Sequence, residues 1–150
     1  MEEYKEEYCS IDNIIEKLKR DGVAVIPDII NEENIIKYQK DMWNTLYKLT
    51  HKLDKPIKEF DKSTWRTFFE LYPLHSMMLH QWNIGHSKLS WDIRQEYGVI
   101  NVFSKIWNVK PEDLLTSFDG MSIHLPPEIT NKGYFRGNEW FHTDQSRLKK

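Results

Sequence analysis

The sequence predicts an α+β fold, with helices in its front part and strands toward its end. Two observations lead to this class. Apolar residues recur three and four positions apart over much of residues 1–110, the spacing of helices that pack one face against a core. Short β-branched runs gather in residues 111–150, and strands and helices do not alternate as in a parallel sheet. The length of 150 residues suits a single domain.

The front of the chain predicts two helices with a strand between them. We expect the first helix from Ile11 to Arg20, ended by Gly22. The run Val23–Ile26 is apolar and mostly β-branched, as in a buried strand. Asn31 is a favourable N-cap for a second helix, which its apolar stripe extends to about residue 50.

The middle of the chain predicts loops and two further helices. Residues 51–62 are polar and predict a loop, and residues 63–72 predict a short helix. Residues 74–96 are rich in His, Trp and Met, and we expect loop and short helix there. A longer helix is expected from Glu96 to Trp107, because its apolar side chains lie mostly on one side.

The last part of the chain predicts the strands. Residues 115–118 and 121–125 have strand character. Asp119-Gly120 between them suits either a two-residue hairpin turn or a bend in one long strand. We expect a loop over residues 126–138 and a last strand over residues 140–145.

Composition and charge exclude several classes of function. Lys and Arg number 21 against 23 Asp and Glu, so the net charge of −2 favours neither nucleic acid nor an anionic membrane as a partner. No apolar run approaches the roughly 20 residues of a membrane span. The acidic start does not resemble a signal peptide, and the single Cys9 excludes an internal disulfide framework. We therefore expect a cytoplasmic protein.

The most suggestive motif is His142-Thr143-Asp144, on the last predicted strand. Residues two apart on a strand point to the same face, so this imidazole and this carboxylate would project together. Two of the three ligands of a 2-His-1-carboxylate iron site can be arranged in this way. The alternative is a strand that carries one surface His and one surface Asp.

Over nearly its whole length the chain resembles the phytanoyl-CoA dioxygenase family of Fe(II)/2-oxoglutarate oxygenases. Three segments carry the resemblance. The first is the opening helix, followed by residues 19–27 with a "DG" turn that leads into a strand, and then by a further helix. The second runs from Trp91-Asp92-Ile93-Arg94 to Ser117-Phe118-Asp119-Gly120. The third is the metal-ligand strand, residues 140–146.

The resemblance implies a double-stranded β-helix, or jelly roll, with a helical layer on one sheet. Residues 1–110 would supply that helical layer and residues 111–150 the first strands. His142 and Asp144 would be the first two ligands of Fe(II), with Trp140 and Gln145 beside the substrate pocket. The family's reaction couples decarboxylation of 2-oxoglutarate to hydroxylation of a small organic or acyl substrate.

The end of the sequence departs from the family pattern. A distal His and an Arg for the far carboxylate of 2-oxoglutarate should follow, but only six residues come after Asp144 and none is His. Arg147 is too close to be that arginine. We therefore expect the front part of a dioxygenase, active only with further chain or a complementing C-terminal polypeptide. His124 is a candidate third ligand, and the alternative for it is a half-exposed strand His.

The sequence also allows two other hypotheses for the function. The chain could be an inactive remnant that binds a partner through an exposed jelly-roll edge, or a small helical binding module in which the HxD triplet is accidental. His75, His80 and His86 are five and six residues apart, spacings that do not align them on one helix face for a zinc site.

Overall fold

The computed structural model describes residues 8–133, which form helices and one small antiparallel sheet, so the α+β class is confirmed. The candidate residues Trp140, His142, Asp144 and Gln145 lie outside this range. The elements are, in order, η2 (Ile11–Asn13), α1 (Ile14–Asp21), α2 (Glu32–Thr50), η3 (Lys62–Leu71), β1 (Met78–Leu79), η4 (Ile84–His86), α3 (Lys88–Arg94), α4 (Tyr97–Trp107), η5 (Pro111–Asp113), β2 (Met121–Ser122) and α5 (Pro127–Thr130).

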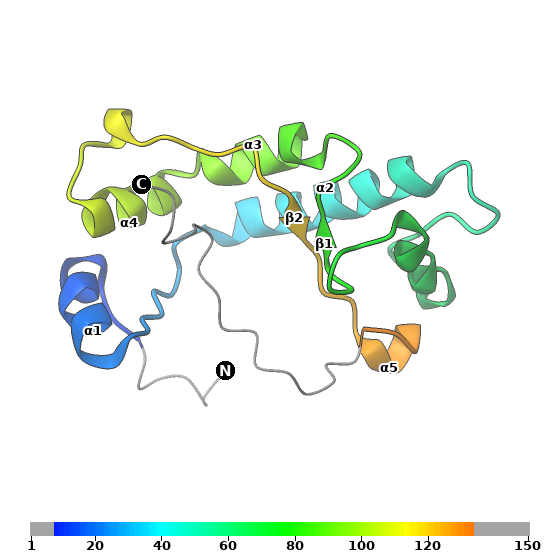
Figure 1. The fold of residues 1–150 in the computed structure, drawn as a ribbon, viewed down its shortest axis with the longest axis horizontal. Coiled ribbons are helices and arrows are strands. Elements are labelled where there is room, and N and C mark those ends of the chain that lie inside the picture. Colours follow the sequence, from blue (N-terminus) through cyan, green and yellow to red (C-terminus); the bar gives the residue numbers. More distant parts are fainter. Residues whose placement is uncertain (1–7, 134–150) are drawn as a thin grey trace, which may run out of the picture.

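The helices lie in two rows, and in this view the small sheet overlaps α2 (Figure 1). The long helix α2 forms one row and contacts the 3-10 helix η3 toward its C-terminal end. α3 and α4 follow one another in the second row, and α3 contacts α2. α1 packs on α4 at one end of the molecule, and α5 packs on η3 at the other. None of the helices in residues 8–133 is long and apolar enough to cross a membrane.

Helix α2 begins where the sequence predicts. The Asn31 side chain accepts a hydrogen bond from the Asn34 backbone N–H at 2.8 Å, which satisfies one of the free donors of the first turn. Glu32 and Glu33 place negative charge at the positive end of the helix dipole. These local interactions fix the start of the helix on which the core is built.

The prediction of a buried strand at residues 23–26 is wrong. Helix α1 ends as expected at Gly22, which has a left-handed φ of 76° and donates its N–H to the Leu18 carbonyl. After it, only Val25 forms a single bridge, to Tyr8, and Val23 is 46% exposed. β-Branched residues give a strand only where a partner strand satisfies their backbone groups, and the described chain supplies one residue pair.

The sheet pairs distant segments rather than neighbours. β1 and β2 are antiparallel, with Met78 opposite Ser122 and Leu79 opposite Met121. Asp119-Gly120 is therefore no hairpin turn, and residues 115–118 form no strand. The partner strand comes from the segment expected as loop and short helix. No jelly roll is formed by residues 8–133, whose ladder is two residues long.

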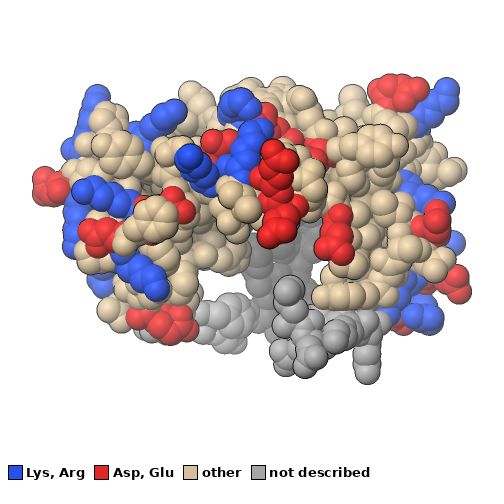
Figure 2. Space-filling model, turned by 180° about the vertical axis from the view of Figure 1, so that it is seen from behind, with Lys and Arg blue, Asp and Glu red and all other residues tan. Residues whose placement is uncertain are grey.

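Other local expectations need smaller corrections. The helix expected at residues 63–72 is the 3-10 helix η3, which begins one residue earlier. The helix expected from Ile11 starts with a 3-10 turn, η2, before α1. The loop expected at 126–138 contains the short helix α5. The face seen in Figure 2 carries acidic and basic side chains interspersed, without a patch of one sign.

The core lies where α2, η3 and the small sheet meet. One buried polar side chain supports it, because the Thr50 hydroxyl donates to the Leu46 carbonyl at 2.7 Å and accepts from the Ile57 N–H at 2.9 Å. The rings of Trp43 and Trp65 stack at its margin, 4.9 Å apart. The buried apolar side chains of this cluster are Leu46, Ile57, Phe68, Leu71, Leu79, Ile84 and Ile123.

Removing the buried ring of Phe68 should strongly destabilise the folded protein. Phe68 is fully buried, whereas Phe60 is 93% exposed. We expect Phe68→Ala to lower the free energy of unfolding by about 3–5 kcal/mol and Phe60→Ala by less than about 0.5 kcal/mol. Urea denaturation followed by circular dichroism measures both, and equal midpoints for the two variants would contradict this core.

Candidate functional site

The end of α3 meets the approach to β2 in a compact junction, here called the α3–β2 corner and made of Gly85, Trp91, Arg94, Phe118, Asp119 and Gly120. The Phe118 ring stacks on the His86 ring with centroids 4.6 Å apart. The Trp91 ring meets the Phe118 ring edge-on at 5.6 Å. Such pairs stabilise by about 0.5–1.5 kcal/mol beyond their buried area.

Arg94 ties the corner together through its guanidinium. One terminal nitrogen donates to the Gly85 carbonyl at 2.7 Å and the other to the Asp119 carbonyl at 2.9 Å. A planar group with fixed donors holds two carbonyls at a set separation, which Lys could not do. The segment leading into β2 is thereby fixed to the helical layer.

Two glycines allow the backbones of the corner to approach. A Cβ on Gly85 would lie 2.4 Å from the Asp119 carbonyl oxygen, and a Cβ on Gly120 would lie 2.3 Å from the Leu79 carbonyl oxygen. Both distances are far below van der Waals contact, and both obstacles are backbone atoms. The corner therefore requires the absence of side chains at these two positions.

Beyond the corner, the chain passes through β2 to His124. Ile123 is buried in the core, while Ser122 and His124 on either side of it are exposed. The Ser122 hydroxyl lies 3.0 Å from His124 Nε2, within hydrogen-bond distance. The predicted metal role of His124 depends on its distance to His142, which lies outside the described residues, so that role stays a prediction.

No group of three or more His, Cys, Asp or Glu side chains that could hold a metal occurs within residues 8–133. His80 has one acidic neighbour, with its Nδ1 atom 3.5 Å from Asp119 Oδ1. His86 is stacked on Phe118 instead. The described residues alone therefore do not make the iron site that the resemblance implies, and that site depends on His142 and Asp144.

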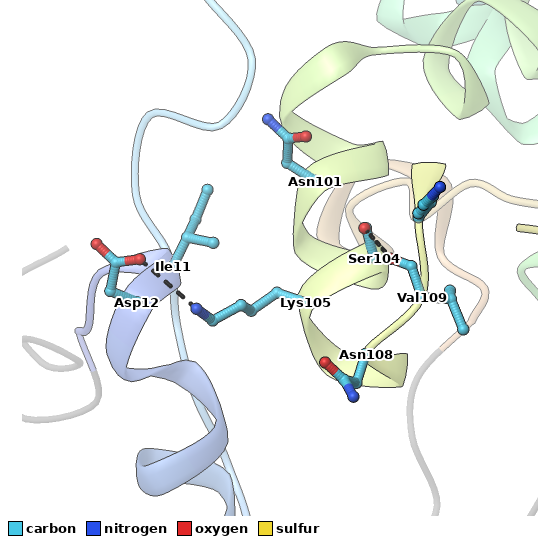
Figure 3. A pocket seen from close by; sticks show the side chains of 8 residues that line it. Ile11, Asp12, Asn101, Ser104, Lys105, Asn108 and Val109 are labelled. Atoms are coloured by element: carbon cyan, nitrogen blue, oxygen red, sulfur yellow. Dashed lines mark hydrogen bonds and ion pairs between the residues drawn. The ribbon is translucent and has the colours of Figure 1, made fainter. Parts of the chain in front are cut away.

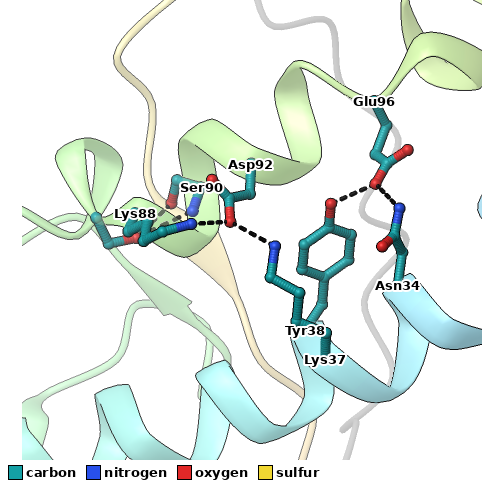
Figure 4. A network of polar contacts seen from close by, with 8 residues as sticks. Asn34, Lys37, Tyr38, Lys88, Ser90, Asp92 and Glu96 are labelled. Carbon is teal, nitrogen blue, oxygen red and sulfur yellow. Dashed lines mark hydrogen bonds and ion pairs between the residues drawn. The ribbon is translucent and has the colours of Figure 1, made fainter.

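A seam of polar contacts joins α2 to the second row of helices (Figure 4). Glu96 Oε1 accepts hydrogen bonds from the Tyr38 hydroxyl and, at 2.8 Å, from the Asn34 amide. The hydrogen bond to Glu96 is the main reason that the pKa of Tyr38 is raised, to about 12.

The same seam includes an acidic residue held between two lysines. Asp92 accepts from Lys88 within α3 and, at 3.1 Å, from Lys37 on α2. These hydrogen bonds, first from Lys88 and then from Lys37, lower the pKa of Asp92 below its ordinary value. The pairs are exposed to solvent, so the seam orients the two helix rows more than it stabilises them.

A surface pocket of about 660 Å³ lies between η2 and the C-terminal half of α4 (Figure 3). Its lining is mainly polar, and Lys105 reaches across it to Asp12, with Nζ and Oδ1 3.7 Å apart. Because Lys105 and Asp12 pair with each other across this pocket, their charges are already matched and attract a charged ligand only weakly.

Sequence reasoning missed the structural roles of Arg94 and Tyr38. Arg94 lies in the Trp91–Arg94 segment that carries the family resemblance, which is the only signal that pointed to it. Its acceptors are backbone carbonyls, which every residue has, so no residue type marks them. Tyr38 and Glu96 are 58 positions apart, and no spacing rule connects them.

Comparison with known proteins does not show a family for this chain. No family model matches the chain, and no solved structure matches it. The chain is 28% identical over 131 residues to "Ava biosynthesis cluster protein O" of Aspergillus versicolor. That alignment covers 87% of this chain and 39% of the relative, so the chain spans well under half of that protein's length.

The close approach at Gly120 can be tested by adding one methyl group. Gly120→Ala should lower the free energy of unfolding by more than about 1 kcal/mol, because its Cβ meets the Leu79 carbonyl oxygen and the backbone must shift. Ser117→Ala, at an exposed position nearby, should change it by less than about 0.5 kcal/mol. Chemical denaturation compares them, and an unchanged midpoint for Gly120→Ala is the result that contradicts the corner.

The hydrogen bond from Tyr38 to Glu96 should be visible in alkaline solution. The raised pKa means that the folded state favours the protonated phenol, so this stabilisation is complete below about pH 10 and is lost as the pH rises toward about 12. Tyr38→Phe should therefore lose less stability over this range than the wild type. Tyr47→Phe, at a 48% exposed position, is the control and should follow the wild type in urea midpoints.

Proposed function

We propose that this chain is the N-terminal part of a non-haem Fe(II)/2-oxoglutarate-dependent oxygenase that hydroxylates a small organic or acyl substrate in the cytoplasm. In this proposal, residues 8–133 are the helical layer and the beginning of the sheet. The iron ligands come from the strand that follows, and further polypeptide supplies the remaining ligand and the 2-oxoglutarate site.

The observation that carries the proposal is the α3–β2 corner. The second segment that carries the family resemblance spans 30 positions, from Trp91 to Gly120. Its characteristic residues lie at its two ends. In the structure these ends meet, since Trp91 contacts Phe118 and Arg94 bonds Asp119. The two ends of the segment that carries the resemblance are thus in contact, which supports a common architectural role.

The open sheet also supports the proposal. β2 is paired with β1 on one side, and within residues 8–133 no further strand joins the ladder. A two-residue ladder is marginal on its own, so additional strands would complete it. The match covers 39% of the length of the relative from Aspergillus versicolor, so that protein is much longer than the matched part.

The proposed site would combine two metal ligands of this chain with bound Fe(II) and 2-oxoglutarate. His142 and Asp144 would coordinate Fe(II), and Trp140 and Gln145 would flank the substrate. Bound iron with 2-oxoglutarate supplies the oxidising power for hydroxylation. The chain's own contribution is to hold the imidazole and the carboxylate on one face of a strand, with coordination positions left open.

A second candidate is a partner-binding protein without enzyme activity. Within residues 8–133 the ladder has only two strands, which favours this candidate, because an open sheet edge accepts a strand from another polypeptide. The two candidates differ in one property, which is the binding of iron through His142.

A measurement of iron binding distinguishes the oxygenase from the partner-binding protein. The protein isolated from its own source, with its intact mass recorded to show whether it continues past Lys150, is titrated anaerobically with Fe(II). We expect saturable binding near one equivalent, lost in His142→Ala and retained in His51→Ala, a change of an exposed histidine at the end of α2. Unchanged circular dichroism shows that both variants fold. Iron binding that survives His142→Ala, or none in the wild type, contradicts the proposal.

A further inference from the structure

A second cavity, of about 360 Å³, forms a groove between α4 and the segment that returns from η5 toward β2. Apolar side chains line most of its length, among them Val99, Phe103, Trp107 and Leu114. Arg94 lies at one end, where α3 meets the returning segment. The groove is therefore apolar along its body and cationic at one end. We call it the α4 groove.

The apolar side chains of the α4 groove lack cover within the described structure. No residue of α4 is buried, although most of its side chains are apolar. Phe103 is 50% exposed, Trp107 68% and Leu115, at the groove rim, 98%. Exposed apolar side chains that line a groove make a candidate site for an apolar ligand.

The charge at the end of the α4 groove is held in a fixed position. The two hydrogen bonds that hold Arg94 go to neutral carbonyls, and within residues 8–133 its guanidinium forms no ion pair with a carboxylate. The nearest acidic side chain along the segment, Asp119, accepts from its neighbour Gly120 and lies beside His80 instead. A guanidinium has five N–H donors, so several remain for a ligand.

We propose that the α4 groove binds a small organic monocarboxylate with an apolar body. The carboxylate accepts hydrogen bonds from the free donors of Arg94, and the apolar body lies along Phe103 and Trp107. Arg94 is the one charged side chain among the described residues that line the groove. Its single positive charge complements a ligand with one negative charge, but not a cation or a polyanion. The cavity volume lies within the usual range for small-molecule sites.

The position of Leu115 offers a test that leaves the fold intact. Its side chain lines the groove yet is 98% exposed, so a polar replacement costs little folding stability. Leu115→Glu adds a negative charge at the rim, which competes for Arg94 and repels a carboxylate. Leu115→Gln has nearly the same shape without the charge and is the matched control.

Calorimetric titration with decanoate, and with decanol as the uncharged analogue, measures the binding. We expect decanoate to bind saturably at one equivalent and at least about tenfold more tightly than decanol. Leu115→Glu should weaken decanoate by at least about tenfold and leave decanol unaffected, whereas Leu115→Gln should stay within about threefold of the wild type for both. Equal affinities for decanoate and decanol, equal effects of the two variants, or no saturable binding would each overturn the proposal.

Discussion

The arrangement of the described chain depends on two hydrogen bonds from the Arg94 guanidinium to backbone carbonyls. They join η4, at Gly85, to the segment before β2, at Asp119, although these residues are 34 positions apart. Because the two strands of the ladder are only two residues long, backbone pairing alone cannot hold them. The guanidinium, the Phe118 ring contacts and the side-chain-free glycines place the approach to β2, and β2 then carries Ile123 into the core.

That anchoring divides the molecule into a closed half and an open half. Around Phe68 and Leu46 the core is complete, with Thr50 satisfying the nearby backbone groups. Around α4, by contrast, apolar side chains remain exposed, and the sheet formed by residues 8–133 has two strands. The open half is where the proposed function needs further contacts. A longer sheet would continue from β2, and the α4 groove has room for a small ligand.

The sequence predicted those features that depend on local interactions. Asn31 with two following glutamates indicates a helix start, Gly22 a helix end, and the apolar stripe to Trp107 a helix, and all three are found. It failed where structure depends on distant partners. Val23–Ile26 lacks a strand to pair with in the described chain, and β2 pairs with a segment rich in His and Met rather than with residues 115–118. The roles of Arg94 and Gly120 depend on backbone atoms of other segments, which residue types do not reveal. The candidate ligands His142 and Asp144 came from a motif and stay a prediction.

We propose that His142 and Asp144 bind Fe(II). Iron K-edge X-ray absorption of the protein loaded anaerobically with one equivalent of Fe(II) tests it most directly, because the spectrum reports the ligands themselves. We predict a first shell of oxygen and nitrogen, with outer-shell scattering from imidazole that disappears in the His142→Ala variant. A spectrum without imidazole scattering, or one that is unchanged by His142→Ala, would contradict the account.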